Sequence, residues 1–211
     1  MSTYIYMVPI DDGAAPNPYG GICTLAICKA NFRRIAKQND WIIGLTIDYK
    51  LIYAMKITSV MSMMEYDNYT KHNLQIKIPN KNSKNIEEQL GDSVYDFSND
   101  NITLRAGVHS RCTKEIDLAG KNVLLSSFFY YFGDKTKVLP KEFENIVNLD
   151  IDFLKLTKES EISFFTWLEN QNFDKNKIYS TPHRIGIISP SDRENDLSCC
   201  IRKKIEKKFL T

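Results

Sequence analysis

The 211-residue sequence has almost no excess of charge of either sign. Twenty-eight Lys and Arg residues stand against 26 Asp and Glu residues, which leaves a formal net charge of +2. Proteins that coat nucleic acids carry a strongly basic surface, because their affinity comes mostly from many phosphate contacts. The charge balance therefore argues against tight coating of duplex DNA. It favours recognition of one nucleotide or one exposed base by locally basic segments, which occur at residues 29–37, 71–84 and 202–208.

Long apolar runs are also missing. The longest stretches without a charge are residues 13–28 and 122–133. The first is broken by Pro and Gly residues, and the second is too short to cross a bilayer. The N-terminus has no basic segment followed by an apolar run, so it does not predict a secretory signal. We therefore expect no membrane partner and a cytoplasmic location.

The cysteines are few, odd in number and scattered, at positions 23, 28, 112, 199 and 200. This pattern predicts reduced thiols in a cytosolic protein rather than a disulfide framework. Cys23 and Cys28 lack a second Cys or His pair at the spacing of a zinc site. The Walker, dinucleotide-binding, metalloprotease and deaminase motifs are absent as well. We therefore expect neither a metal nor a cofactor.

The apolar pattern predicts one domain of mixed helices and strands. Runs rich in β-branched and aromatic residues predict strands over residues 3–8, 41–47, 51–60 and 122–132. Helical periodicity predicts helices over residues 32–37, 143–147 and 161–170. Because no linker or repeat divides the chain, we expect a core over residues 1–140 and a helical C-terminal extension over residues 141–211 that packs on it.

Polar and reactive residues are most concentrated in residues 15–29, Ala-Pro-Asn-Pro-Tyr-Gly-Gly-Ile-Cys-Thr-Leu-Ala-Ile-Cys-Lys. Two X-Pro units and paired glycines restrain the backbone and allow the close approach of a ligand or another strand. Arg33 and Arg34 follow directly after this segment. The segment is a candidate ligand-binding loop, and the alternative is a buried loop whose cysteines serve packing.

This segment begins a series of blocks that resembles the nucleotide modification associated domain 2 family. The further blocks are Arg-Arg at 33–34, Asn-Asp-Trp-Ile-Ile-Gly at 39–44, Leu-Ile-Tyr-Ala-Met-Lys-Ile-Thr at 51–58, Gly-Asp-Ser-Val-Tyr at 91–95, Val-Leu-Leu-Ser at 123–126 and Phe-Tyr-Tyr-Phe-Gly at 129–133. Asn39 departs from the Gly that the family usually has there, and residues 30–32 depart from its Pro and basic residue. The resemblance spans about residues 4–170 and implies a role in phage and bacterial systems that make or handle modified nucleotides.

The order of elements also resembles that of PUA-like domains, with the EVE and ASCH branches as the closest comparison. This resemblance implies an α+β fold in which a small curled β-barrel or sheet is flanked by helices. It also implies that a base is read in a pocket beside the first helix. By this analogy the pocket would be lined by Asn17, Cys23, Thr24, Lys29, Arg33, Arg34 and Trp41.

Such a pocket needs an aromatic plate for the face of the base, and amides or hydroxyls for its edge. Trp41, Tyr19 or Tyr53 would supply the plate, and Asn17 and Thr24 would contact the edge. The alternative for Trp41 is a core position at the start of a strand.

Three cations would hold the phosphate of the nucleotide. Lys29, Arg33 and Arg34 are the candidates for this clamp. The alternative for the two arginines is a solvated helix face. His109, in Gly-Val-His-Ser-Arg-Cys at 107–112, is a further candidate that would orient a phosphate or act as a general base, unless it is simply an exposed loop histidine.

We therefore expect a protein that binds a modified base or nucleotide, free or within a nucleic acid. One alternative is an enzyme that processes modified nucleotides or bases, with Cys23 or His109 in the catalytic role, because nearby Lys29 and Arg33 would favour a reactive thiolate. Another alternative is an interaction subunit of a larger modification or defence system that uses the helical C-terminal part.

Overall fold

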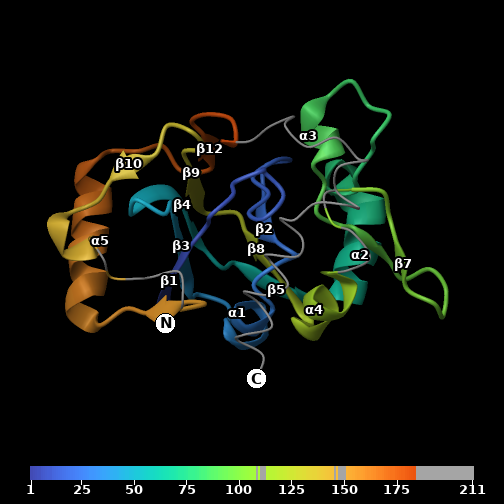
Figure 1. Cartoon of the computed structure of the whole chain (residues 1–211), viewed down its shortest axis with the longest axis horizontal. Helices are drawn as coiled ribbons and strands as arrows, with labels where there is room; N and C mark the ends of the chain where they lie inside the picture. The colour runs from blue at the N-terminus through green and yellow to red at the C-terminus, as the bar shows by residue number, and fades with distance from the viewer. Residues whose placement is uncertain (108, 110–112, 145, 147–150, 184–211) are drawn as a thin grey trace.

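The structure is a computed structural model that describes residues 1–107, 109, 113–144, 146 and 151–183. The described residues form a mixed α/β structure with a seven-stranded sheet, a three-stranded sheet and a two-stranded hairpin (Figure 1). The large sheet runs β11 (Leu154–Lys155), β1 (Thr3–Met7), β3 (Trp41–Leu45), β4 (Lys50–Lys56), β9 (Phe129–Tyr131) and β12 (Lys177–Ile178), with β10 (Lys137–Val138) also paired to β4. The small sheet is β2 (Cys23–Leu25), β8 (Asn122–Ser126) and β5 (Ser59–Ser62), and the hairpin is β6 (Tyr95–Asp96) and β7 (Thr103–Leu104).

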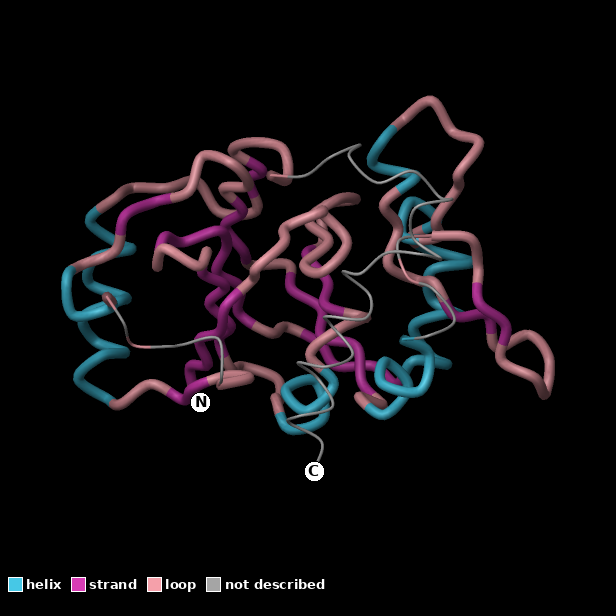
Figure 2. Tube along the Cα trace, in the orientation of Figure 1, coloured by secondary structure: helices cyan, strands magenta, loops and turns pink. Residues whose placement is uncertain are grey.

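The helices lie outside the strands (Figure 2). They are α1 (Ala30–Ile35), α2 (Met63–Asn73), α3 (Ile86–Gln89), α4 (Lys114–Ala119) and α5 (Lys158–Asn170), with 3-10 turns η1 (Gln75–Lys77) and η3 (Lys141–Phe143). Local sequence explains where the longer helices begin. Ser62 and Glu65 form a reciprocal capping box at the start of α2, and the Thr157 side chain accepts a hydrogen bond from Ser160 N at the start of α5.

Alternating side chains give the large sheet two buried faces. In β1, Tyr4 and Tyr6 pack with Phe32 of α1, whereas Ile5 and Met7 point to the opposite face. The second face is covered by α5 and η3, and Figure 1 shows α5 at one end of the molecule and α2 at the other. In Figure 1 the small sheet lies between the large sheet and α2, and α1 and α4 lie side by side at the lower edge of the molecule.

Each of the two longest predicted strands divides between the two sheets. The predicted strand over residues 51–60 becomes β4 and β5, and the predicted strand over residues 122–132 becomes β8 and β9. The change occurs where the backbone partner changes: Ile57 N donates to Asp40 O, but Thr58 N donates to Leu125 O of β8. Ser126 marks the second break, because its hydroxyl bonds both to the amide and to the carbonyl of Phe128. An apolar run predicts a buried strand and carries no signal for such a change of partner.

The predicted mixture of helices and strands is confirmed, but the curled barrel is not. Within the described part of the chain, the end strands β11 and β12 pair only with β1 and β9, so the sheet stays open. Residues after 140 do more than form helices, because they supply β11 and β12 to the large sheet. Part of the helix predicted over residues 143–147 and the whole basic segment 202–208 lie outside the described residues. No helix in the described ranges is both long enough and apolar enough to cross a membrane.

One carboxyl group is buried next to this core. Asp11 is 3 % exposed, and its Oδ2 accepts a hydrogen bond of 2.6 Å from the hydroxyl of Tyr131. Burial raises the pKa of Asp11 to about 6, although the hydrogen bond from Tyr131 opposes this rise. The folded protein therefore favours the neutral carboxyl group.

The raised pKa of Asp11 predicts a pH dependence of stability. Between about pH 4 and pH 6 the folded state keeps a proton that the unfolded state has lost, so the free energy of unfolding falls as the pH rises through this window, by roughly 3 kcal/mol from this group alone. Urea denaturation of wild type and Asp11→Asn across pH 4–7 measures the difference. Asp48 is the control, because Lys50 and Thr46 lower its pKa from 3.8, so its titration lies below the measured range and Asp48→Asn should leave the slope between pH 4 and pH 7 unchanged. Parallel curves for wild type and Asp11→Asn would contradict the prediction.

Candidate active site

Three side chains from separate parts of the chain form a hydrogen-bonded row. Cys28 Sγ lies 3.2 Å from His109 Nε2, and His109 Nδ1 lies 2.5 Å from Asp117 Oδ2. The imidazole thus lies between the thiol and the carboxylate and uses a different ring nitrogen for each. A nucleophile, a base and a residue that orients the base have the same order in hydrolases that use covalent catalysis.

The row runs from the interior towards the surface. Asp117 is fully buried, His109 is 7 % exposed, and Cys28 is half-buried. The reactive end of the row is therefore the end with access from outside. Cys28 lies two residues before α1, and Asp117 lies on α4, which packs beside α1.

The backbone at the thiol has an uncommon conformation. Cys28 and Lys29 are consecutive non-glycine residues with φ values of 58° and 44°, in the left-handed region. Such residues cost free energy and persist where surrounding contacts hold them, often at functional sites. Here Cys28 N donates a hydrogen bond of 2.8 Å to Asp117 Oδ1. The same carboxylate therefore orients the imidazole and holds the backbone of the thiol residue.

The electrostatics of the row favour a charged pair. Burial alone would lower the pKa of His109, but the charges of Asp117 and Cys28 and their hydrogen bonds raise it well above its ordinary value. Burial likewise would raise the pKa of Asp117, but the charge of His109 and its hydrogen bond lower it. The Tyr95 hydroxyl donates a further hydrogen bond of 2.7 Å to Asp117 Oδ2. The carboxylate of Asp117 therefore stabilises His109 in the protonated form that it reaches when it accepts a proton.

The same three residues could in principle approach a metal ion, because their ligand atoms lie within 4.8 Å of one another. A tetrahedral site needs ligand atoms that converge on one point. Cys28 and Asp117 instead face opposite nitrogens of one imidazole, and both Asp117 oxygens accept hydrogen bonds. The donor set therefore fits proton transfer better than chelation.

The two loop residues that were expected to contact the edge of a base are buried and form hydrogen bonds within the protein. Asn17 and Thr24 are fully buried. Asn17 Oδ1 accepts a hydrogen bond of 2.7 Å from Lys77 Nζ, and Thr24 Oγ1 donates one of 2.6 Å to Asp92. Tyr19 is buried as well, at 4 % exposure. These contacts hold the loop in place. They agree with the alternative interpretation of residues 15–29, in which the segment is a buried loop with a packing role.

Cys23 does not suit the role of nucleophile that the sequence suggested for it. Its side chain is fully buried, and burial raises the pKa of its thiol to about 12. The thiolate, which is the reactive form, is therefore rare at neutral pH. Cys28, five residues further along the same segment, has the partner and the access that Cys23 lacks.

The structure does not bring the three candidate phosphate-binding cations together. Arg34 is exposed, whereas Lys29 forms an ion pair of 3.2 Å with Asp152 and lies over the ring of Tyr6. Arg33 is fully buried, and its guanidinium group donates to three backbone carbonyls. A solvated helix face therefore describes Arg34 but not Arg33.

Two of the three candidate aromatic plates, Trp41 and Tyr53, belong to opposite faces of the large sheet. Trp41 packs edge-on against Phe128 and Phe165, on the face that α5 covers. Tyr53 is fully buried on the other face, where its hydroxyl lies 2.7 Å from that of Tyr6. Trp41 thus occupies a core position at the start of β3.

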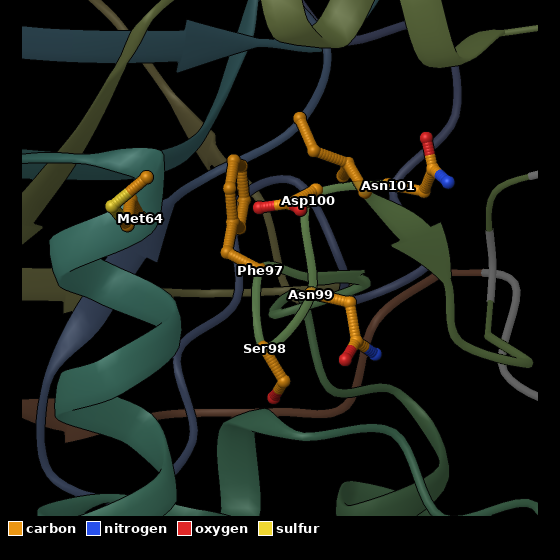
Figure 3. Close-up of a pocket in the computed structure, with 7 residues that line it drawn as sticks. Met64, Phe97, Ser98, Asn99, Asp100 and Asn101 are labelled. Carbon is orange, nitrogen blue, oxygen red and sulfur yellow. The ribbon is translucent and has the colours of Figure 1, made fainter.

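An open groove lies beside α2 and the loop of the β6–β7 hairpin (Figure 3). It is lined by Met64, Phe97, Ser98, Asn99, Asp100, Asn101 and Ile102. The hairpin also reaches the row, because Tyr95 of β6 bonds to Asp117, and Lys114 of α4 donates to the carbonyl of Ile102. The groove and the row are therefore supported by the same elements.

Sequence reasoning singled out His109, but not Cys28, Asp117 or Tyr95, which form one hydrogen-bonded group with it in the structure. A signal existed for Cys28, because it lies in the segment 15–29 and is followed by a lysine. Asp117 had none, since it lies in a short helix among other charged residues. Its role depends on the packing of α4 against α1.

The comparisons with known proteins agree with the resemblance seen in the sequence. A family model described as nucleotide modification associated domain 2 matches residues 1–187. No curated protein and no solved structure matches the chain. Because the match covers most of the chain, this protein belongs to the nucleotide modification associated domain 2 family.

Proposed function

We propose that this protein is an enzyme of a nucleotide-modification system that removes or transfers an acyl substituent carried by a base or nucleotide. The observation that supports this proposal is the Cys28–His109–Asp117 row, with its half-buried thiol at one end. The family name supports nucleotides as the context of the reaction. Cys28 acts as the nucleophile, His109 transfers the proton, and Asp117 orients the imidazole.

The reaction needs water or an amine as its only co-reactant. The proton of Cys28 passes to His109 Nε2, and the sulfur forms a bond to the carbonyl carbon of the acyl group. The bond from that carbon to the nitrogen or oxygen of the nucleotide then breaks, and the leaving atom takes the proton from Nε2. Water or an amine attacks the thioester, which releases the acyl group and restores the thiol.

Binding of a modified base or nucleotide without reaction is the second candidate. The groove at the β6–β7 hairpin supports it, because the Phe97 ring offers a face for stacking, and the amides of Asn99 and Asn101 offer donors and acceptors for a base edge. A PUA-like mode of reading a base, in a free nucleotide or in a nucleic acid, belongs to this candidate.

Thiol alkylation tests the nucleophile without knowledge of the substrate. We expect iodoacetamide to label Cys28 at least about tenfold faster than Cys23 at neutral pH, because His109 accepts the proton of Cys28, whereas burial keeps Cys23 protonated. Mass spectrometry of digested protein measures both rates in one sample. Equal rates at the two cysteines would overturn the proposed nucleophile.

N-acetylated nucleosides test the reaction itself. Incubation with N4-acetylcytidine or N6-acetyladenosine should release acetate and leave an acetyl group on Cys28 after rapid quenching. Cys28→Ala should do neither, and Cys23→Ala serves as the matched control that should retain both. Saturable binding without an adduct, lost in Phe97→Ala, would instead favour the second candidate and contradict the first.

A further inference from the structure

The structure assigns Arg33 as a positioning residue that holds the reactive thiol segment and the carboxylate segment of the row together. This inference rests on the proposed function, since it concerns the geometry of that same row. Arg33 donates from Nε to Cys28 O at 2.7 Å and from Nη2 to Asp117 O at 2.6 Å. Its Nη1 donates to Asn122 O of β8 at 2.6 Å.

These contacts form a closed ring with the row. The carbonyl of Cys28 is bonded to Arg33, while its amide is bonded to the carboxylate of Asp117. The carbonyl of Asp117 is bonded to Arg33 in turn. One planar group therefore sets the spacing between Cys28, two residues before α1, and Asp117 in the middle of α4. The third hydrogen bond of Arg33, to Asn122 O of β8, connects both segments to the small sheet.

The ring also accounts for how the left-handed backbone at residues 28 and 29 is maintained. Two consecutive non-glycine residues in that region cost of order 1–3 kcal/mol each. A charged donor bonded to the intervening carbonyl offsets part of this cost. Without it, the backbone at Cys28 could relax to an ordinary conformation, which would move Sγ away from His109.

A lysine could not replace the guanidinium group at this position. The three carbonyls are reached by three separate nitrogens of one rigid fork, whereas an ammonium group is a single point on a flexible stem. Gly120 leaves room for the fork, because a Cβ atom there would lie 2.5 Å from the central carbon of the guanidinium group. The space around Arg33 is therefore shaped for this group.

Lys77 provides a matched control for the loss of a buried cation. It is also fully buried, and its Nζ donates to Asn17 O, Asn17 Oδ1 and Ile22 O. These contacts hold the loop before β2 and do not touch the row. A purely structural role for Arg33 predicts that the Arg33 and Lys77 variants lose stability but keep the reactivity of Cys28 in the folded protein.

The test measures alkylation of Cys28 by iodoacetamide from pH 5 to pH 9 in the full chain, below the melting temperature of each variant. We expect Arg33→Lys and Gly120→Ala to slow Cys28 at least about tenfold and to change its pH profile, since a misplacement of about 1 Å costs roughly 100-fold in oriented reactions. Lys77→Met should lower the melting temperature and leave the rate at Cys28 unchanged. Added guanidinium ion, but not methylammonium, should restore part of the rate in Arg33→Ala.

Two results separate this inference from the proposed function. If wild-type Cys28 reacts no faster than Cys23, the proposed function fails before any variant is compared. If wild-type Cys28 is selectively reactive, but folded Arg33→Lys or Gly120→Ala keeps the wild-type rate and pH profile, the assignment of Arg33 is overturned. If Arg33→Lys does not fold, Gly120→Ala by itself tests the assignment of Arg33. This substitution displaces the guanidinium group without removing its charge.

Discussion

Asp117→Asn is expected to lower Cys28-dependent turnover roughly 10⁴-fold, the loss that the same change causes in a Ser-His-Asp triad. Both oxygens of Asp117 accept hydrogen bonds: Oδ1 from Cys28 N, and Oδ2 from Tyr95 and His109. An amide replaces one oxygen by a donor, so in either orientation a donor meets a donor. If the amide nitrogen faces His109, the proton moves to Nε2, which can then no longer accept the proton of Cys28.

The matched control is Asp92→Asn. Asp92 is buried to the same degree and accepts hydrogen bonds of 2.6 Å from Tyr66 and from Thr24, but it lies outside the row. Both variants should lose stability, because each disturbs a buried carboxylate network. Only Asp117→Asn should reduce acetate release and the alkylation rate of Cys28 in the folded protein. Turnover at the wild-type rate in Asp117→Asn would remove Asp117 from the mechanism.

Phe164→Ala is expected to lower the free energy of unfolding by about 3–5 kcal/mol. The side chain of Phe164 is fully buried on α5, against Phe143, Phe165 and Trp167, on the second face of the large sheet. Its removal leaves a cavity between the helix and the sheet, which the surrounding rings can fill only in part. Urea denaturation measures the loss.

Ile162→Ala is the control on the same helix, since Ile162 is 66 % exposed. It should change the free energy of unfolding by no more than about 0.5 kcal/mol. Because α5 and the row lie on opposite sides of the large sheet, Phe164→Ala should leave the alkylation rate of folded Cys28 unchanged. Equal losses of stability in the two variants would show that α5 is not packed as the structure has it.

The fold was partly predictable because local patterns reflect local burial. The alternation in residues 3–8 and the apolar run at 41–47 led correctly to β1 and β3, and the periodicity at 161–170 led to most of α5. The breaks after β4 and β8 were not predictable, because an apolar run carries no signal for a change of hydrogen-bond partner. The partners of Ile57 and Thr58 distinguish the two sheets at the first break, and the hydrogen bonds of the Ser126 hydroxyl mark the second.

The sequence by itself determined the family, through the ordered blocks between residues 15 and 133. A ligand-binding role for residues 15–29, and a ligand no larger than a nucleotide or an exposed base, stay predictions that rest on local residues and on a net charge of only +2. Sequence blocks and net charge depend on the residues alone and not on how the chain folds.

The tertiary structure alone decided which residues meet. Cys28 and His109 are 81 residues apart in the chain, and Asp117 lies eight residues beyond His109 on another element. Their side chains come together because α1 packs on α4 and because Arg33, predicted as a phosphate-binding cation or as part of a solvated helix face, is buried between them. The burial of Arg33 has no local signal. Cys23 and Cys28 both lie in the segment 15–29, so which of the two thiols is accessible depends on which side chains the rest of the chain covers.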